Sequence, residues 1–358
     1  MKPAISICVP TYNGSEFIKE CLDSILNQTF SDFEVIIVDD KSSDQTIEII
    51  RVYASKDSRI TIIENPQNLG LVGNWNRCIE LSKGEWIKFI FQDDTIAPNC
   101  LERMLEESTP ECDLVFCRRN FIFESNVSDE KRKEYERFVD SDKALPNTTQ
   151  ITAYEYCQTM VSQPWVNIIG EPTSSMVRRR AFDRFGGFNP NLIQICDLEL
   201  WDRIATNMGI TFLRENLAAF RVHNESTTAK NHTSLTYRVS LDFMIMAHDF
   251  AFHPAYQNLR KFCVEQTKLD LSELMRREAY YAWIRGQSIA AMKPQESKKI
   301  DLAWEVITEK YPRIAEAKNL NLFKQIQYKL LLQVSSLKRE VSLRINALVH
   351  RINSTINN

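Results

Sequence analysis

Two pairs of adjacent aspartates, Asp39-Asp40 and Asp93-Asp94, each come just after an apolar run. Hard cations such as Mg²⁺ and Mn²⁺ prefer carboxylate oxygen, and they bind through one or two carboxylates plus the phosphates of a substrate. Two adjacent carboxylates in an apolar setting repel one another unless a cation or a proton intervenes. The Asp93-Asp94 pair therefore indicates a metal-assisted site for a phosphorylated ligand. Aspartates also collect in the turns after strands for structural reasons, so one such pair taken alone is a weak motif.

The elements that must position these residues alternate between strands and helices. Apolar residues on consecutive positions predict strands buried on both faces at 5–9, 35–38, 60–63, 86–91 and 114–117. Between the first two runs, apolar residues from Phe17 to Ile25 recur at helical spacing. This alternation predicts an α/β fold with a mainly parallel sheet and helices on both sides. Ligands in such sheets bind outside the carboxyl ends of the strands, where we expect Thr11, Tyr12 and both aspartate pairs to meet.

The remaining segments are less regular. Ser42 with Gln45 has capping-box spacing, which predicts a helix from about Asp44. Residues 118–150 lose their periodicity and include a charge run at 129–137, which predicts a long polar connection, either a flap over the site or a solvated insertion. Apolar segments at 211–213 and 218–222 follow, and nearly everything beyond His232 is predicted to be helical. We expect a catalytic domain at 1–230, a helical region at 231–317 and a C-terminal helix at 318–358.

Composition narrows the class of protein. The chain has 358 residues, of which 44% are hydrophobic and 25% charged, as in a packed globular protein. Its formal net charge of -3 gives no electrostatic reason to expect nucleic acid as a partner. Its nine cysteines form no C-x-x-C pair or zinc-spaced cluster, and no signal peptide or run of roughly 18 apolar residues is present. These features predict a cytoplasmic protein with reduced thiols and no membrane-spanning segment.

The motifs taken in series resemble the family 2 glycosyltransferases, whose nucleotide-binding domain has the GT-A fold. The resemblance covers residues 4 to about 228 and follows the family's order along the chain. It is carried by Val9-Pro10-Thr11-Tyr12-Asn13, Val38-Asp39-Asp40-Lys41-Ser42-Ser43-Asp44, Asn68-Leu69-Gly70, Lys83-Gly84-Glu85-Trp86-Ile87, Gln92-Asp93-Asp94, Gly186-Gly187-Phe188, Cys196-Asp197-Leu198-Glu199-Leu200-Trp201 and Arg221-Val222-His223-Asn224-Glu225-Ser226.

This resemblance implies a nucleotide-sugar donor and a divalent cation, Mn²⁺ or Mg²⁺. It places the base of the donor against Tyr12, with Asp40 accepting a hydrogen bond from a ring nitrogen, so uridine is the expected base. Pro10, Thr11 and Asn68 would belong to the same donor-binding set, and Asp93 would lie near the ribose and the metal. Asp94 is expected to be the principal metal ligand, with His223 completing the metal or diphosphate site. A satisfied surface histidine is the alternative for His223.

Asp197 matches the family's catalytic base, which implies an inverting reaction. The apolar residues that follow it predict a helix start, so an ordinary carboxylate at a helix N-terminus is the competing interpretation. Glu199 lies two residues on, would face another way on a helix, and is the second candidate for the base.

The chain departs from the family pattern at two places. Many relatives carry an aspartate where this chain has Phe91, and an Ala-Arg-Asn stretch where it has Asn74-Trp75-Asn76. In this interpretation Arg77 or Lys83 takes over the polar contacts of the arginine that the Ala-Arg-Asn stretch would supply. Both departures affect contacts with the donor more than the activity itself.

The C-terminal helix combines an apolar stripe with basic residues. From Ile326 to Ile352 the apolar positions recur in steps of about 3.7 residues, and Glu340 is the only acid in that stretch. A basic amphipathic helix at 318–352 fits the anionic inner surface of a cell membrane, and it fits equally a second copy of the chain or the catalytic domain. A membrane position would suit a lipid-linked or other glycan acceptor in cell-surface polysaccharide assembly.

Three other functions compete with a sugar transferase. A sugar nucleotidyltransferase usually begins with a Gly-rich phosphate loop, which Pro10-Thr11-Tyr12-Asn13-Gly14 does not provide. A degenerate, non-catalytic binding subunit would have lost metal or base residues, whereas Asp94, Asp197 and His223 are all present. A dehydrogenase is disfavoured because no G-x-G-x-x-G follows the first strand.

Overall fold

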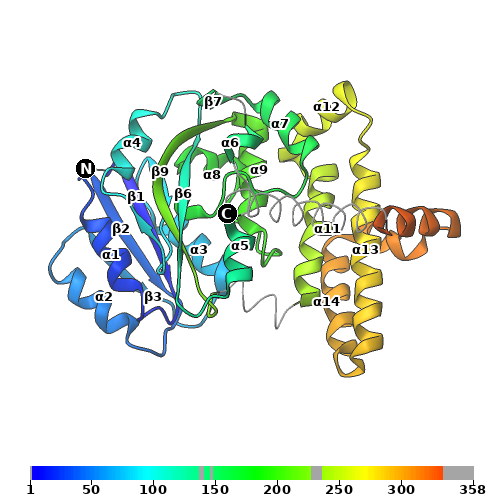
Figure 1. Cartoon of the computed structure of the whole chain (residues 1–358), viewed down its shortest axis with the longest axis horizontal. Helices are drawn as coiled ribbons and strands as arrows, with labels where there is room; N and C mark the ends of the chain where they lie inside the picture. The colour runs from blue at the N-terminus through cyan, green and yellow to red at the C-terminus, as the bar shows by residue number, and fades with distance from the viewer. Residues whose placement is uncertain (1, 137–140, 146–147, 227–235, 334–358) are drawn as a thin grey trace, which may run out of the picture. The chain divides into compact units, whose positions relative to one another are not determined.

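The computed structural model describes residues 2–136, 141–145, 148–226 and 236–333. The chain divides into two compact units, Met1–Leu271 and Ser272–Asn358. Figure 1 shows a sheet flanked by helices in the first unit and only helices in the described part of the second. Residues 236–271 are grouped with the sheet, and the division at 230 and 317 expected from sequence stays a prediction.

The sheet confirms the α/β fold with mostly parallel strands. Its order is β3-β2-β1-β4-β8-β6-β9-β5, with β7 beside β9. Strand β1 runs parallel to β2 and β4, β2 to β3, and β6 to β9, while β8, β5 and β7 pair antiparallel. The strands span Ile5–Thr11 (β1), Phe33–Asp39 (β2), Ile60–Glu64 (β3), Trp86–Phe89 (β4), Thr95–Ile96 (β5), Leu114–Phe123 (β6), Gln150–Ile151 (β7), Ser175–Arg178 (β8) and Ile210–Val222 (β9).

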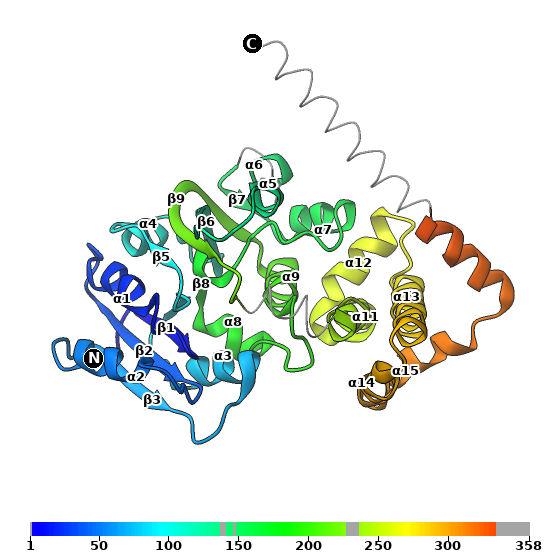
Figure 2. The same ribbon diagram turned by 60° about the horizontal axis from the view of Figure 1, so that its bottom comes forward.

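Every residue of β1 is buried, as a central parallel strand requires. The helices of this unit are α1 Ile18–Leu26, α2 Thr46–Ala54, α3 Gly70–Leu81, α4 Cys100–Glu106, α5 Asp129–Glu136, α6 Ser141–Ala144, α7 Ala153–Ser162, η1 Pro172–Ser174, α8 Arg179–Phe185, α9 Cys196–Met208, α11 Thr236–Phe252, η2 Pro254–Tyr256 and α12 Gln257–Gln266. Figure 2 shows α1 and α4 on one side of the sheet and α3 and α9 on the other. Helix α1 buries Ile18, Cys21, Leu22 and Ile25, so the helical spacing predicted there is confirmed.

The predicted capping box at Ser42 is wrong. The Ser42 hydroxyl donates to Asp39 Oδ1 at 2.6 Å and accepts from the Asn13 N–H at 2.8 Å. Helix α2 begins at Thr46, whose N–H donates to Asp44 Oδ1 at 3.1 Å. Ser42 therefore forms hydrogen bonds within the neighbouring loops and does not cap the helix.

Residues 118–150 are more regular than predicted. Strand β6 continues to Phe123, and the charge run forms helix α5. The two apolar segments at 211–213 and 218–222 belong to one long strand, β9. Because β6 and β9 support each other along most of their length, pairing imposes a strand where the sequence shows weak periodicity.

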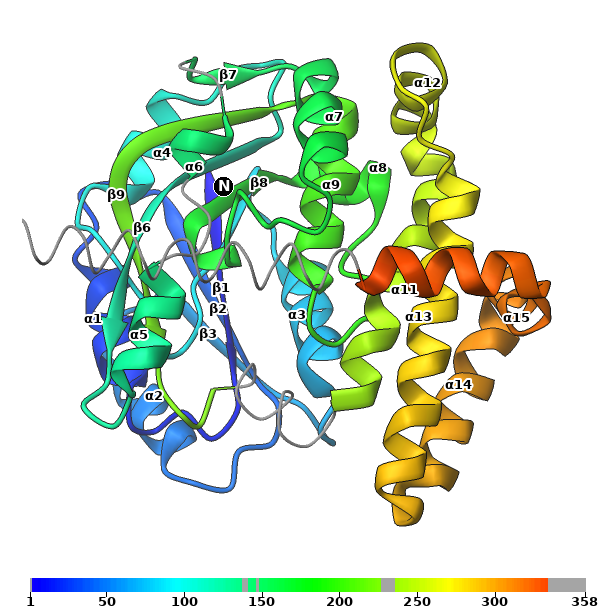
Figure 3. The ribbon, with the colours of Figure 1, turned by 45° about the vertical axis from the view of Figure 1, so that its right-hand side comes forward.

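The second unit is helical where it is described. Its helices are α13 Leu271–Met292, η3 Pro294–Glu296, α14 Ser297–Lys310, α15 Pro312–Ala315, η4 Glu316–Asn319 and a helix at 322–333. Figure 3 shows the helix at 322–333, in red, lying across α13, where the Tyr281 hydroxyl donates to the Tyr328 carbonyl at 3.0 Å. The rest of the predicted amphipathic helix, 334–352, lies outside the described residues. Among the described residues, none of the helices has the length and apolar character needed to cross a bilayer.

Candidate active site

Hydrogen bonds join the end of β1 to the end of β2, and the loop after β1 to the loop after β4. Thr11 donates through its hydroxyl to Asp39 Oδ1 at 2.9 Å. The Tyr12 N–H donates to Gln92 Oε1 at 2.9 Å, and Gln92 Nε2 donates back to the Tyr12 carbonyl at 3.1 Å. The Tyr12 backbone is therefore fixed while its ring is 51% exposed, as a residue that stacks on a ligand must be. Pro10 precedes this loop as a buried residue of β1, opposite Val38.

Asp40 is buried and organises the start of α3. Its Oδ1 accepts from the Leu69 N–H at 2.7 Å and from Asn65 Nδ2 at 2.9 Å, and its Oδ2 accepts from the Gly70 N–H at 2.9 Å. Asn68 Nδ2 donates to the Asp40 carbonyl at 3.1 Å. The structure thus brings Asp40 and Asn68 together, and it leaves one lone pair of Asp40 Oδ2 for a further donor.

Asp94 is fully buried between three segments. Its Oδ2 accepts from the Thr173 hydroxyl at 2.5 Å, and its Oδ1 accepts from the Arg221 N–H at 2.9 Å. Burial, and secondarily the charge of Asp93, raises the pKa of Asp94 well above its usual value. Asp94 therefore ties the loop before β5 to η1 and to the end of β9.

His223 meets Asp93 at the end of β9. Its Nε2 lies 3.0 Å from Asp93 Oδ2, and the Asp93 side chain is 21% exposed. The Phe17 ring packs edge-on against the imidazole at 5.0 Å between ring centroids. Arg221 Nε donates to the Asp93 carbonyl at 2.9 Å and so holds the loop below the pair. The imidazole of His223 thus contacts Asp93, and its predicted role beside Asp94 as a metal ligand stays a prediction.

A divalent cation fits the Asp93–His223 pair. One carboxylate oxygen of the partly exposed Asp93 and one imidazole nitrogen of the nearly buried His223 lie side by side, which is a donor set that Mn²⁺ accepts. No group of three metal-ligating side chains occurs among the described residues. A cation bound here would therefore depend on phosphate oxygens of a substrate for further ligands.

Asp197 lies in the first turn of α9 and is partly exposed. Its Oδ2 accepts from Asn167 Nδ2 at 3.0 Å, and its Oδ1 accepts from the Leu198 N–H at 2.8 Å. Burial among protein atoms raises the pKa of Asp197 to about 7, and the nearby Glu171 charge adds to this rise while Arg119 opposes it. A carboxylate with these properties can exchange a proton near neutral pH.

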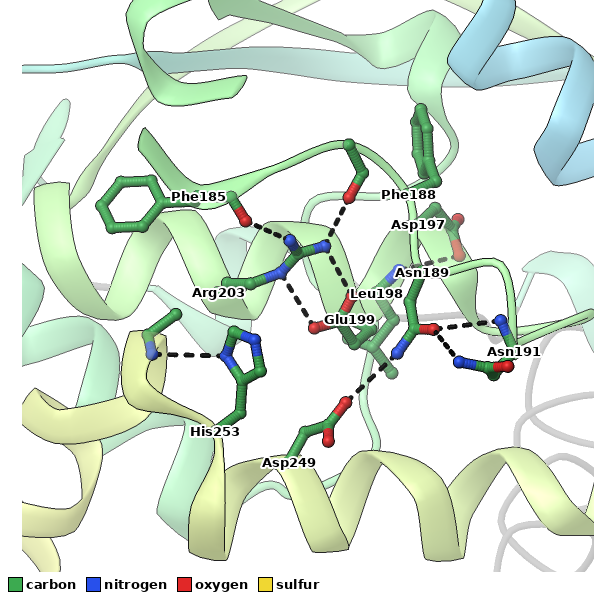
Figure 4. A network of polar contacts seen from close by, with 12 residues as sticks. Phe185, Phe188, Asn189, Asn191, Asp197, Leu198, Glu199, Arg203, Asp249 and His253 are labelled. Atoms are coloured by element: carbon green, nitrogen blue, oxygen red, sulfur yellow. Dashed lines mark hydrogen bonds and ion pairs between the residues drawn. The ribbon is translucent and has the colours of Figure 1, made fainter. Parts of the chain in front are cut away.

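Glu199, the second candidate for the base, is engaged in the protein interior. It is 2% exposed and accepts from Arg203 Nε at 3.0 Å, from Arg203 Nη2 at 2.8 Å and from the Tyr256 hydroxyl at 3.0 Å. Figure 4 shows Glu199 directed into the Arg203 network, with Asp197 lying apart from it on the same helix. The geometry therefore favours Asp197 for proton transfer.

Sequence reasoning missed Arg119 and Glu171. Arg119 Nε lies 2.5 Å from Glu171 Oε2, and both side chains are largely buried. The charge of Glu171 raises the pKa values of both Asp94 and Asp197, so the Arg119–Glu171 pair lies within electrostatic range of both carboxyl groups. The register of β6 against β9 shifts on both sides of Arg118, and such bulges redirect side chains. No local signal in the sequence marks this irregularity.

The two departures from the family pattern meet in space. The Trp75 ring stacks on Phe91 with centroids 4.7 Å apart and planes at 25°, and the Phe188 ring packs edge-on against Trp75 at 4.9 Å. Asn76 Oδ1 accepts from the Phe188 N–H at 2.8 Å and its Nδ2 donates to the Phe188 carbonyl at 2.9 Å. At the two places where the resemblance to the family lapses, this chain therefore has an apolar stacked pair, Trp75 and Phe91.

The comparisons with known proteins agree with this geometry. The family profile described as glycosyl transferase family 2 matches residues 6–186. The uncharacterized glycosyltransferase MJ1057 of Methanocaldococcus jannaschii is 30% identical over 229 residues, which cover 62% of this chain and 72% of that protein. The chain therefore belongs to glycosyl transferase family 2, and it is a glycosyltransferase.

Two solved structures share the fold. TarS residues 1–349 of S. aureus, in complex with UDP-GlcNAc, aligns with a TM-score of 0.55 at 18% identity and covers 92% of this chain and 89% of that one. The mannosyltransferase PcManGT of Pyrobaculum calidifontis, in complex with GDP-Man and Mn²⁺, aligns with a TM-score of 0.50 at 18% identity, covering 90% and 88%. At these identities the likeness establishes the GT-A type of fold.

Proposed function

We propose that this glycosyltransferase moves a sugar from a nucleotide sugar to a hydroxyl group of its acceptor, with inversion at the anomeric carbon. The observation that carries the proposal is Asp197. Its carboxylate is partly exposed, receives two protein hydrogen bonds and has a pKa raised to about 7. These are the properties of a general base that works near neutral pH.

The chain's own residues divide the reaction between them. Asp197 takes the proton of the acceptor hydroxyl as that oxygen attacks the anomeric carbon from the side opposite the leaving group. The bond between the anomeric carbon and the diphosphate breaks with its electron pair going to the diphosphate. One displacement inverts the configuration and requires no covalent sugar-enzyme intermediate. Asn167 and the Leu198 N–H hold the carboxylate in place during the transfer.

Asp93 and His223 are the residues we assign to a divalent cation, Mn²⁺ or Mg²⁺. The fit rests on their 3.0 Å separation, on the partial exposure of Asp93 and on the full burial of Asp94. When bound, the cation neutralises negative charge on the departing diphosphate. Asp94 becomes a residue that positions the loop, because it has no exposed surface and bridges the Thr173 hydroxyl to the Arg221 N–H.

The donor end is formed by Tyr12, Asp40 and Asn68. The exposed ring of Tyr12 offers a stacking surface for a base, and the remaining lone pair of Asp40 Oδ2 can accept from a ring N–H. A uracil N–H has this character, so UDP-sugars are the donors proposed first.

A donor screen tests the proposal. The full-length protein would be incubated with UDP-, GDP- and dTDP-sugars, each with Mn²⁺, Mg²⁺ or chelator, and free nucleotide measured. We expect cation-dependent release from a UDP-sugar, and an acceptor product whose anomeric configuration by NMR is opposite to that of the donor. Retention of configuration, or full activity in chelator, would contradict the proposed mechanism.

We also propose a membrane-surface location that brings the enzyme to a lipid-linked or other glycan acceptor. The helix at 322–333 exposes Leu322, Phe323, Ile326 and Leu330, and Lys329 on the same helix is exposed as well. An exposed apolar stripe with basic residues binds anionic lipid in a salt-dependent manner.

Vesicle sedimentation tests whether this apolar stripe binds a membrane surface or a second copy of the chain. Serine at Phe323, Ile326 and Leu330 together should abolish binding to anionic vesicles and leave hydrolysis of the donor unchanged. Val264→Ser, which changes an 84% exposed residue of the first unit, is the control. A wild-type chain that ignores anionic vesicles but dimerises through the stripe would assign the helix to a second copy.

A further inference from the structure

A lysine side chain is completely buried beneath the candidate site. Lys88 lies in β4 with no exposed surface. Its Nζ donates to the carbonyl oxygens of Thr173 and Ser175, the latter at 3.1 Å. No acidic side chain is an ion-pair partner of Lys88 in the described part of the chain. Lysine is almost never fully buried unless its donors are satisfied, so these two carbonyls account for its position.

The segment that Lys88 holds is the one that contacts Asp94. The Thr173 hydroxyl accepts from the Phe91 N–H at 3.2 Å and donates to Asp94 Oδ2 at 2.5 Å. Cys117 Sγ makes a further contact with the Ser174 carbonyl at 3.4 Å. A chain of contacts therefore leads from Lys88 through Thr173 to the loop of residues 91–94, which carries Asp93.

Loss of the Lys88 amino group alone would leave the carbonyl oxygens of Thr173 and Ser175 without this donor. Such a loss costs stability, because a buried acceptor is left unpaired. What a methionine could not supply at position 88 is the pair of hydrogen bonds that fixes residues 173–175. The specific contribution of Lys88 is thus the placement of the Thr173 hydroxyl.

We propose that Lys88 is a positioning residue for sugar transfer, which holds η1 so that Thr173 and Asp94 keep the Asp93 loop in its working geometry. The proposal rests on the proposed function for its kinetic consequence but not for its structural one. Lys88 touches no reacting atom and acts only through Thr173.

A double-mutant cycle in the full-length chain tests this coupling. Lys88→Met and Thr173→Val each remove one link, and Lys88→Gln keeps an N–H donor on a shorter stem. We expect each of the first two variants to lower kcat at least tenfold, with UDP affinity measured without cation within about twofold of wild type. The double variant should be no slower than the slower single variant, and Lys88→Gln should be intermediate. Ile87→Val, a buried neighbour in β4, is the matched control and should keep wild-type kcat.

Hydrogen exchange at the Phe91 N–H supplies a readout that needs no activity. Lys88→Met should accelerate this exchange by at least tenfold without lowering the unfolding midpoint to a similar degree. Multiplicative effects in the double variant, unchanged exchange at Phe91, or failure of both Lys88 variants to fold would overturn the proposal. A wild-type chain that turns over no nucleotide sugar would instead refute the proposed function, and the exchange result would still decide the role of Lys88.

Discussion

The acids at 93 and 94 and those at 197 and 199 are two pairs of sequence neighbours that the fold treats alike. In each pair one member is buried and satisfied by protein donors: Asp94 by Thr173 and the Arg221 N–H, Glu199 by Arg203 and Tyr256. The other member, Asp93 or Asp197, stays partly exposed at the candidate site. The difference in burial within each pair indicates that exposure to a ligand, more than residue type, separates a carboxylate that can take part in the reaction from one that stabilises the fold.

Four variants that replace each acid by its isosteric amide test whether the buried and the partly exposed acids differ in role. The largest effect is expected at Asp197. Asp197→Asn keeps the size and the hydrogen-bonding oxygen but cannot accept the acceptor's proton. We expect kcat to fall by roughly a hundredfold or more, with UDP binding unchanged, in line with the loss of a general base. Steady-state kinetics and calorimetric binding measure the two quantities. Transfer at the wild-type rate would place the base elsewhere.

Glu199→Gln should instead act on stability. The change leaves the buried Arg203 guanidinium without its anionic partner, which costs about 3–5 kcal/mol when one member of a buried pair is removed. Denaturant unfolding measures the loss, and kcat per folded molecule should stay near wild type. A stable but inactive Glu199→Gln enzyme would reverse the assignment of Asp197 and Glu199.

The pair at 93 and 94 should divide in the same way with smaller effects. Asp93→Asn should lower kcat by about tenfold to a hundredfold and raise the Mn²⁺ concentration needed for half activity, because it weakens a ligand of the proposed cation. Asp94→Asn keeps an acceptor for the Arg221 N–H but replaces the oxygen that accepts from the Thr173 hydroxyl, so we expect a smaller loss of activity, about threefold to tenfold, than for Asp93→Asn. If Asp94→Asn alone abolishes cation dependence, Asp94 is the ligand that the sequence resemblance implied.

The pH dependence offers the smallest and most specific test. Asp197 must be ionised to act as a base, so kcat/KM should rise with pH through a midpoint near 7. Glu171→Gln removes a negative charge that raises this pKa and leaves the Arg119 charge that lowers it. The acid limb should therefore shift to lower pH in the variant, with Glu85→Gln, which alters an exposed acid, as the control. An unmoved limb would show that Glu171 does not act on Asp197.

Much of the fold was predictable because its signals are local. The buried runs at 5–9 and 35–38 lie in β1 and β2, and the spacing of Ile18, Cys21 and Ile25 forms α1. The predicted cap at Ser42 is wrong because the Ser42 hydroxyl donates to Asp39 instead. Asp39 is in turn held by the hydroxyl of Thr11, 28 residues away along the chain. The lengths of β6 and β9 were not predicted because each strand depends on the other for its hydrogen bonds.

The sequence by itself determined which polar side chains are available and at which edge of the sheet they lie. Tyr12, Asp40 and the pair Asp93-Asp94 follow strands whose ends meet in any parallel α/β fold. Tertiary structure alone decided which acid of each pair is buried and which stays partly exposed. It also joined Arg119 to Glu171 and stacked Trp75 on Phe91, pairs that are 52 and 16 residues apart along the chain. The physical reason is that strand runs and helix periods are encoded within a few residues. Burial and pairing arise only when distant segments close around one another.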